Sequence, residues 1–288
     1  MKGVLIKNVS IWSLAAVLMF SACNKGGEKQ NQREETDSIT HAVDSSSTYL
    51  SESPTKLDAV FDDFLLGYAS DSAMQWNRTR FPLPYSKKGK AESVGMQKWK
   101  MTTLFGGELC YTILFDTEKD IDLPTHTDLT EGLFEWIYPD RNTVSQYHFR
   151  RNDQGAWYLD SLCEASLDNN PNAGFLKFYK KFATDIEYQK KHIDTPIDFV
   201  TNFTDDNDGF TTDNFRIDMD QWLAWQVPMP AEKITNIVYG LRDNKTTQAA
   251  TRKILCIKAV DGTFFKALYF AKYKDNEWML YKYEDTAY

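Results

Sequence analysis

The sequence predicts an α+β protein in which one α+β unit occurs twice. An ungapped alignment of residues 58–85 with residues 172–199 gives seven identities and four near matches. Each aligned segment begins with apolar residues at helical spacing. Segments rich in aromatic and β-branched residues follow, and these are typical of strands. Helices that precede a run of strands are typical of the α+β class.

The repeat extends over most of the chain. Beyond the aligned segments, Trp99 matches Trp222 and Trp157 matches Trp278, in the same order. The offsets of the matches are 114, 123 and 121 residues, so only loop lengths differ between the copies. Three matches in one order indicate a duplicated unit. The identities in the aligned segments are Ala59/Ala173, Phe61/Phe175, Phe64/Phe178, Ala69/Ala183, Asp71/Asp185, Gln75/Gln189 and Pro82/Pro196.

Each copy is predicted to begin with a helix. Ser53 and Pro54 supply a cap and a first-turn proline for the first helix, and Pro82 and Pro196 mark positions that the helices cannot pass. The apolar residues recur every three or four positions and form one stripe. The stripe consists of Leu57, Val60, Phe61, Phe64, Leu65 and Tyr68 in the first copy, and of Phe175, Phe178, Tyr179 and Phe182 in the second.

The remainder of each copy is predicted to form antiparallel strands. In the first copy, FEWIYP precedes a hairpin whose strands, TVSQYHFRR and AWYLDSLC, flank the turn NDQG. In the second copy, a four-stranded meander is predicted from KITNIVYG, RKILCIKAV, FFKALYFAKY and EWMLYKYE. These strands carry too many aromatic residues to leave both faces in water, so the helices are expected to cover one face of each sheet.

The combined motifs resemble a known family. Both copies contain F-x2-F-x3-[FY]-A-[ST]-D-x3-Q, then a proline–hydrophobic pair, a lone tryptophan and a hairpin with [GN]-x-W. This pattern, between residues 57 and 286, resembles a Bacteroidetes lipoprotein family of unknown function with tandem NTF2-like domains. The resemblance implies two such (cystatin-like) domains, at residues 54–167 and 171–288. Each would have N-terminal helices packed on a curved antiparallel sheet, often with a pocket between helix and sheet. It implies no activity.

The first 23 residues have the features of a bacterial lipoprotein signal. Lys2 and Lys7 precede an apolar run at residues 11–20, which is about half of the roughly 20 residues that a bilayer span needs. The run ends in FSAC, which resembles the lipobox, with Phe20 where that pattern usually has Leu. We therefore expect residues 1–22 to be a lipoprotein signal peptide and Cys23 to carry the lipid. An ordinary signal peptide with a chance cysteine is the alternative.

Residues 23–53 are predicted to form a disordered tether, because they are polar and nearly free of large apolar side chains. Acyl chains such as palmitate on Cys23 would anchor the globular part to a membrane. Asn24 is not the aspartate that often retains lipoproteins in the inner membrane, so we expect the outer membrane of the cell envelope. The tether lacks a dense acidic run, which favours the periplasmic side over the cell surface.

Charge and cysteine usage limit the function classes. Without residues 1–22 the chain has 31 basic and 41 acidic residues, a net charge of −10, which disfavours nucleic acid as a partner. Cys110, Cys163 and Cys256 have spacings unlike a CxxC metal site, and their odd number disfavours a disulfide framework. Buried thiols are expected, and a single disulfide between any two of them stays open.

The repeated Asp–Gln pair is the first candidate site. Asp71 and Gln75, like Asp185 and Gln189, are four residues apart and share a helix face. Each aspartate follows a small hydroxyl residue where the apolar stripe ends, which suits the N-cap of a second helix. Lining a ligand pocket is the alternative. Both copies need a cap, whereas only one needs a catalytic residue, so capping is favoured.

Other candidate residues have plain structural explanations. Trp222 and Trp225 are either core residues or an aromatic ligand platform. His126, His148 and His192 have no histidine at the matching position of the other copy, and are expected to be neutral strand or loop residues.

Residues 204–215, TDDNDGFTTDNF, suggest calcium, but Thr and Phe stand where an EF-hand loop needs acids. A solvated acidic loop is expected, with a weak calcium site of another kind as the alternative. No metal site and no cofactor are predicted.

These observations lead to three function hypotheses. The leading one is a binding or scaffold module of the cell envelope that holds a small ligand or an envelope protein. The second is a pocket enzyme of the isomerase or hydrolase kind, which would need a recessed carboxylate or histidine with a shifted pKa. The third is a purely structural spacer between the membrane and another component.

Overall fold

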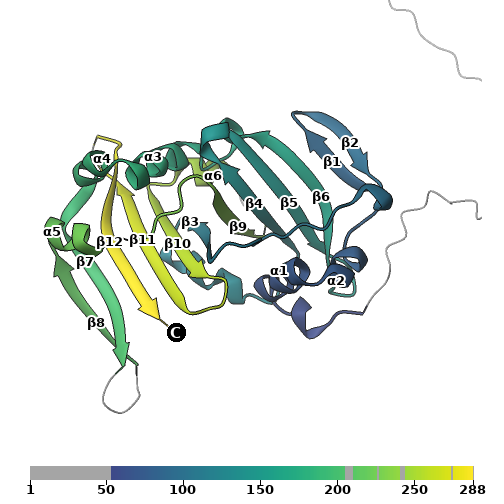
Figure 1. The fold of residues 1–288 in the computed structure, drawn as a ribbon, viewed down its shortest axis with the longest axis horizontal. Helices are drawn as coiled ribbons and strands as arrows, with labels where there is room; N and C mark the ends of the chain where they lie inside the picture. The colour runs from purple at the N-terminus through teal and green to yellow at the C-terminus, as the bar shows by residue number, and fades with distance from the viewer. Residues whose placement is uncertain (1–52, 205–209, 226, 241–243, 274, 288) are drawn as a thin grey trace, which may run out of the picture. The chain divides into compact units, whose positions relative to one another are not determined.

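The structure is a computed structural model that describes residues 53–204, 210–225, 227–240, 244–273 and 275–287. These residues belong to one compact unit, Ser46–Tyr288 (Figure 1). The predicted signal peptide and Cys23 lie outside the described residues, as does the predicted tether up to residue 52. None of the described helices has the length and apolar character that crossing a membrane requires.

The unit is a mixed α+β structure whose two halves have corresponding elements. The first half comprises η1 Lys56–Asp58, α1 Phe61–Ser70, α2 Ser72–Asn77, β1 Leu83–Lys87, β2 Lys90–Val94, η2 Met96–Lys98, β3 Cys110–Phe115, η3 Glu118–Thr125, β4 Glu131–Tyr138, η4 Pro139–Arg141, β5 Thr143–Arg151 and β6 Trp157–Ser166. The second comprises η5 Leu167–Asn169, α3 Ala173–Thr184, α4 Ile186–Lys191, β7 Ile193–Thr204, β8 Phe210–Ile217, α5 Met219–Trp225, β9 Ile234–Tyr239, α6 Asn244–Ala249, β10 Arg252–Ala259, β11 Phe264–Lys272 and β12 Trp278–Ala287.

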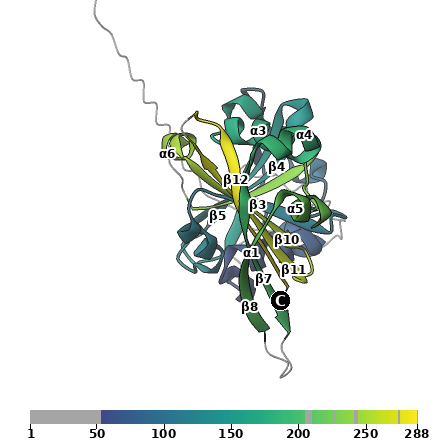
Figure 2. The same ribbon diagram turned by 90° about the vertical axis from the view of Figure 1, so that its left-hand side faces the viewer.

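The strands form two six-stranded sheets, and the two halves exchange one strand each. Sheet A has the order β2-β1-β6-β5-β4-β9, and sheet B has the order β3-β10-β11-β12-β7-β8 (Figure 1). Figure 2 shows the unit from the side of β7 and β8. Strand β3 of the first half therefore pairs with β10 of the second, and β9 of the second pairs with β4 of the first. The prediction of two tandem domains assumed that each copy builds its own sheet. The structure instead joins the halves through their sheets.

The exchanged strands meet at two matching threonines. Thr112 of β3 and Thr235 of β9 are 123 residues apart, the same offset as Trp99 and Trp222. The Thr235 hydroxyl donates to the Thr112 carbonyl oxygen at 3.0 Å, and the Thr112 hydroxyl donates in return to the Thr235 carbonyl oxygen. Both threonines are buried. The junction therefore satisfies polar groups that would otherwise be unpaired in the interior.

Two strand predictions are wrong. The meander was predicted to contain four consecutive strands. Its first strand, β9, instead pairs with β4 in sheet A and does not pair with β10, which belongs to sheet B. An apolar pattern defines a strand but not the sheet edge that it pairs with, and both faces of β9 are buried. In addition, β1 pairs with β6 and β7 pairs with β12 in parallel, where antiparallel strands were expected. Parallel pairing needs a long connection, and here most of each half supplies it.

The helices pack as the apolar stripes predict. In the first half, α1 lies on sheet A with the Phe61 ring 4.7 Å from the Trp157 ring and the Phe64 ring 5.6 Å from the Phe149 ring. A Cβ at Gly132 of β4 would lie 2.3 Å from the Phe61 ring, so only glycine allows this approach. The implied pocket between helix and sheet is filled by these aromatic rings.

The second half repeats this packing. The Phe175 ring of α3 lies 5.3 Å from the Phe270 ring and 5.2 Å from the Trp278 ring of sheet B. The cysteines Cys110, Cys163 and Cys256 are free thiols, with Cys256 buried and the other two partly exposed. No pair of these three forms a disulfide.

Candidate functional site

The repeated aspartates lie at the starts of the second helices. The Asp71 side chain accepts hydrogen bonds from the backbone N–H groups of Ala73 and Met74 at 2.8 and 3.1 Å, at the N-cap of α2. The Asp185 side chain accepts from the backbone N–H groups two and three residues further on, both at 3.0 Å, at the N-cap of α4. Both carboxylates satisfy N–H groups that a helix leaves unpaired at its start.

The repeated glutamines hold later segments against the helices. The Gln75 side chain donates to the Thr102 carbonyl oxygen at 2.8 Å and accepts from the Thr102 N–H at 2.6 Å. The Gln189 side-chain oxygen accepts from the Trp222 indole N–H at 2.9 Å. Gln189 also lines a small cleft of about 220 Å³ with Met229. Both glutamines are buried and fully engaged in these contacts.

The two tryptophans of the predicted platform are separated in role. Trp222 is 2% exposed and belongs to the core of the second half. Trp225 is 47% exposed, its ring lies 4.9 Å from that of Phe199, and its indole N–H donates to Asp285 at 2.9 Å. The structure therefore does not bring the two indoles together as one exposed surface.

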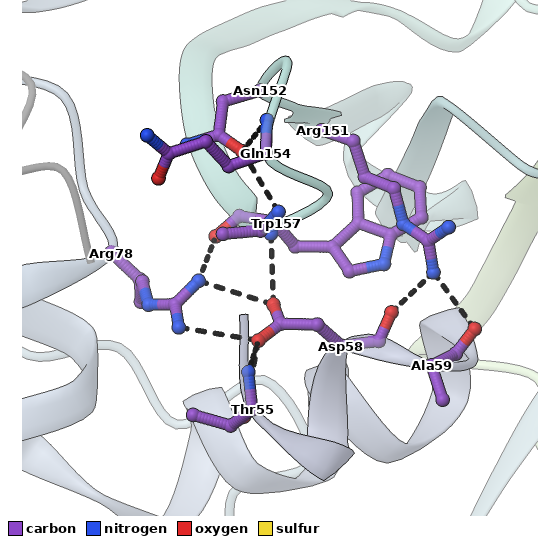
Figure 3. A network of polar contacts seen from close by, with 9 residues as sticks. Thr55, Asp58, Ala59, Arg78, Arg151, Asn152, Gln154 and Trp157 are labelled. Atoms are coloured by element: carbon purple, nitrogen blue, oxygen red, sulfur yellow. Dashed lines mark hydrogen bonds and ion pairs between the residues drawn. The ribbon is translucent and has the colours of Figure 1, made fainter. Parts of the chain in front are cut away.

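A buried ion pair that the sequence did not reveal joins η1 to the end of α2, beside Trp157 at the start of β6 (Figure 3). The Arg78 guanidinium lies 3.1 and 3.2 Å from the two carboxylate oxygens of Asp58, and both side chains are 2% exposed. Asp58 also accepts from the backbone N–H groups of Thr55 and Trp157 at 2.7 and 2.8 Å. Arg151 lies over the Trp157 ring and donates to the backbone carbonyl of Asp58. This network fixes the start of the first half.

The second half replaces this ion pair. In the ungapped alignment, Asn172 stands opposite Asp58 and His192 stands opposite Arg78. The His192 ring contacts the Tyr188 carbonyl oxygen at 2.7 Å, while Asn172 accepts from the Lys253 ammonium at 2.6 Å. The 114-residue offset of the repeat matches these positions in the sequence. Because the residue types differ, the sequence did not show that the two pairs occupy the same place in the fold.

A polar cleft lies on the outer face of sheet A, the face opposite α1. Strand residues alternate between faces, and Gly132, which contacts α1, is on the inner face. The cleft has a volume of about 420 Å³. Strands β4, β5 and β6 form its floor, and residues 169–172 with α6 form its walls. Polar groups at the cleft are Glu131, Glu135, Gln146, His148, Arg150, Asp160, Ser161, Ser166, Asn169, Asn170, Asn172, Asn244 and Thr247.

Glu135 is the recessed carboxylate of the cleft. It is 2% exposed, and its two oxygens accept hydrogen bonds from the side-chain amides of Gln146, Asn170 and Asn236 at 2.8, 2.9 and 2.8 Å. These amides come from β5, from the segment before α3, and from β9. A buried carboxylate is stabilised by such donors. In the sequence, Glu135 was visible only as a charge that interrupts the apolar run FEWIY.

The other charges at the cleft are arranged in opposite pairs. The Arg150 guanidinium lies 3.4 Å from a Glu131 oxygen and 3.8 Å from an Asp160 oxygen. Asp160 also pairs with Arg80 at 3.0 Å. Beside them, burial lowers the pKa of the His148 imidazole. Asp160 and Glu131 oppose this effect on the pKa and Arg150 adds to it, so His148 is neutral at neutral pH.

A second recessed carboxyl, Asp62 of α1, is separate from the cleft. Burial raises its pKa, and the Tyr239 hydroxyl donates to it at 2.7 Å with the Lys258 ammonium 3.7 Å away. It does not line the polar cleft.

The remaining predictions concern metals and calcium. Within the described ranges, no group of three or more His, Cys, Asp or Glu side chains is placed to hold a metal ion. Of the acidic stretch 204–215, residues 205–209 lie outside the described residues, and 210–215 belong to edge strand β8.

Comparisons with known proteins place this architecture among NTF2-like folds. A crystal structure of an NTF2-like protein from Bacteroides fragilis NCTC 9343 is 38% identical, with a TM-score of 0.72. The match covers 82% of this chain and 100% of that chain. The chain belongs to the family described as "Domain of unknown function (DUF4348)", which matches residues 42–285. No curated protein matches the chain.

Proposed function

We propose that the protein is a binding module that holds a small polar ligand in the outer-face cleft of sheet A. The observation that carries the proposal is the built polar cleft of about 420 Å³, which is within the range of small-molecule sites. Its floor is formed by three strands in the interior of sheet A, so the backbone that carries these polar groups is fixed by pairing on both sides. Preorganised groups of this kind reduce the entropic cost of binding.

Binding is favoured over catalysis by the state of the carboxylates. An enzyme of the isomerase or hydrolase kind would need a recessed base with free lone pairs facing its substrate. Glu135 already accepts hydrogen bonds from three amides, and Glu131 and Asp160 face guanidinium groups. The Asp62 carboxyl has a raised pKa but does not line the cleft.

We also propose the cellular setting from the sequence. Residues 1–22 act as a lipoprotein signal peptide, Cys23 carries acyl chains, and the tether 23–53 places the unit at the periplasmic side of the outer membrane. The unit itself is a duplicated NTF2-like domain with copies at residues 54–167 and 171–288. The seven identities and the matching element order of the two halves support the duplication.

Native mass spectrometry of the chain, solubilised from its own membranes, tests both proposals. The lipid anchor predicts a mass above that of residues 23–288 by an acyl modification, and no increment would refute it. The binding function predicts a further small-molecule mass that leaves on activation. Ser161→Trp, which fills the cleft, should lose this mass, whereas Ser93→Trp on exposed edge strand β2 should keep it. The small-ligand proposal would be overturned if the additional small-molecule mass were the same in wild type and Ser161→Trp, or absent from both. A larger protein assembly without a small-molecule mass would overturn it as well.

A further inference from the structure

The cleft offers a ligand uncharged hydrogen-bonding groups rather than free charges. Its guanidinium and carboxylate groups face each other, and Glu135 is occupied by amides. A charged ligand would lose hydration on entry. For an anion, the Arg150 guanidinium among the described lining residues already faces Glu131 and Asp160. For a cation, those two carboxylates already face guanidinium groups, and the oxygens of Glu135 already accept from three amides. The cleft therefore disfavours both carboxylate and ammonium ligands.

The uncommitted polar groups of the cleft are a neutral set of donors and acceptors. Among the described residues, the side chains of His148, Ser161, Asn169 and Asn244 have no hydrogen-bond partner, and the Gln146 side-chain oxygen is also uncommitted. Each of these groups pairs well with a hydroxyl, which both donates and accepts. They come from β5, β6 and the two walls, so they approach a ligand from several sides.

Position in the sheet separates ligand classes further. Peptides that bind to sheets add a strand at a free edge, but the floor strands β4, β5 and β6 are interior strands of sheet A. Bases are held by stacking on aromatic side chains. Of the lining residues that the structure describes, Phe149 alone is a Phe, Tyr or Trp, and it is 1% exposed and packs against α1 on the inner face. Apolar contact comes instead from Leu133 and Val238.

We propose that the ligand of this cleft is an uncharged saccharide, an inference that depends on the proposed binding function. A compact sugar presents hydroxyl groups in several directions and apolar C–H faces. The neutral groups around the cleft and its small apolar contacts match this chemistry.

Saturation-transfer NMR on the full mature chain tests the ligand class with four probes of similar size. Glucose and N-acetylglucosamine are uncharged, glucuronate carries a carboxylate and glucosamine carries an ammonium. We expect transfer to at least one uncharged probe, with affinity about tenfold or more above that of either charged probe. Ser161→Trp should abolish the signal and Ser93→Trp should preserve it.

A milder variant guards against misfolding of Ser161→Trp. Asn169→Ala removes one exposed wall amide that has no partner in the described residues, and should weaken the uncharged probe roughly three- to tenfold. Equal or tighter binding of a charged probe, lost in Ser161→Trp, would overturn the saccharide class and leave the binding function standing. No binding of any probe would also overturn the class. The binding function would fall with it only if the Ser161-dependent mass were absent in native mass spectrometry.

Discussion

The outer face of sheet A and the corresponding face of sheet B have the same strand geometry but opposite chemistry. By the pairing registers, Glu135 corresponds to Cys256, Gln146 to Ala267 and His148 to Tyr269, with an offset of 121 residues. The three residues of sheet B are buried in an apolar core. Their counterparts in sheet A are polar and line the cleft. The fold therefore does not require a polar cleft at this position.

The helical segments η3 and α6, which lie beside these two regions, also differ in polarity. In the first half, the 3-10 helix η3 contributes Ile121 and Leu123, which pack against the core. In the second half, the polar helix α6 contributes Asn244 and Thr247 to the wall of the cleft. Corresponding positions of the two halves therefore differ, because one packs in an apolar core and its counterpart lines a polar cleft. Variants at corresponding positions test this difference between the halves.

The largest effect is expected at the buried ion pair of the first half. Asp58→Asn should lower the free energy of unfolding by about 3–5 kcal/mol, because it leaves the Arg78 charge buried without its partner. Urea unfolding measures the change, and Asp63→Asn on the exposed side of α1 should stay within about 0.5 kcal/mol of wild type.

The second half suggests a rescue of this variant. Asp58→Asn combined with Arg78→His introduces the neutral residue types of Asn172 and His192 into the first half. The double variant should be more stable than Asp58→Asn alone, because it no longer holds a buried guanidinium. A loss below about 1 kcal/mol in Asp58→Asn would show that the pair does not stabilise the first half.

An intermediate effect is expected at the two matching helix caps. Asp71→Ala and Asp185→Ala should each cost about 1 kcal/mol, because each leaves two backbone N–H groups without their acceptor. The costs should add in the double variant, since the caps share no partner. The same urea titration applies, with the exposed Asp153→Ala as control. A large cost at only one cap would mean that the halves differ here too.

The sequence predicted the parts of the fold that depend on local pattern. The stripe containing Phe61 and Phe64, and its repeat in the second half, correctly placed α1 and α3. Strand exchange was beyond prediction, because it depends on which free edge β3 and β9 pair with, and those edges lie more than a hundred residues away. The cleft was missed for a related reason. Glu135 gains its significance only when the amide of neighbouring Gln146 is joined by amides from two more distant segments, those of Asn170 and Asn236.

The smallest effect is a pH dependence that only the first half should show at this position, because Tyr269 replaces His148 in the second. The lowered pKa of His148 means that the unfolded chain binds more protons than the folded chain between the folded pKa and about 6.5. The contribution of His148 to stability is therefore fully present above pH 6.5 and is lost as pH falls toward the folded pKa. Wild type should lose more Tm than His148→Gln between pH 7.5 and 5.5, in a thermal melt at each pH.

The test of His148→Gln needs a control variant that removes an imidazole outside the cleft. His126→Gln is suitable, because His126 lies about half exposed beside Asp128 and away from the cleft. Equal slopes of Tm against pH in wild type and His148→Gln would mean that the imidazole does not titrate as its burial between Glu131, Arg150 and Asp160 requires. A flatter slope in His148→Gln than in His126→Gln would locate the proton uptake at the cleft. It would also support ligand binding that weakens below the same pH, since a protonated His148 adds a charge to the uncommitted groups of the cleft, which are otherwise neutral.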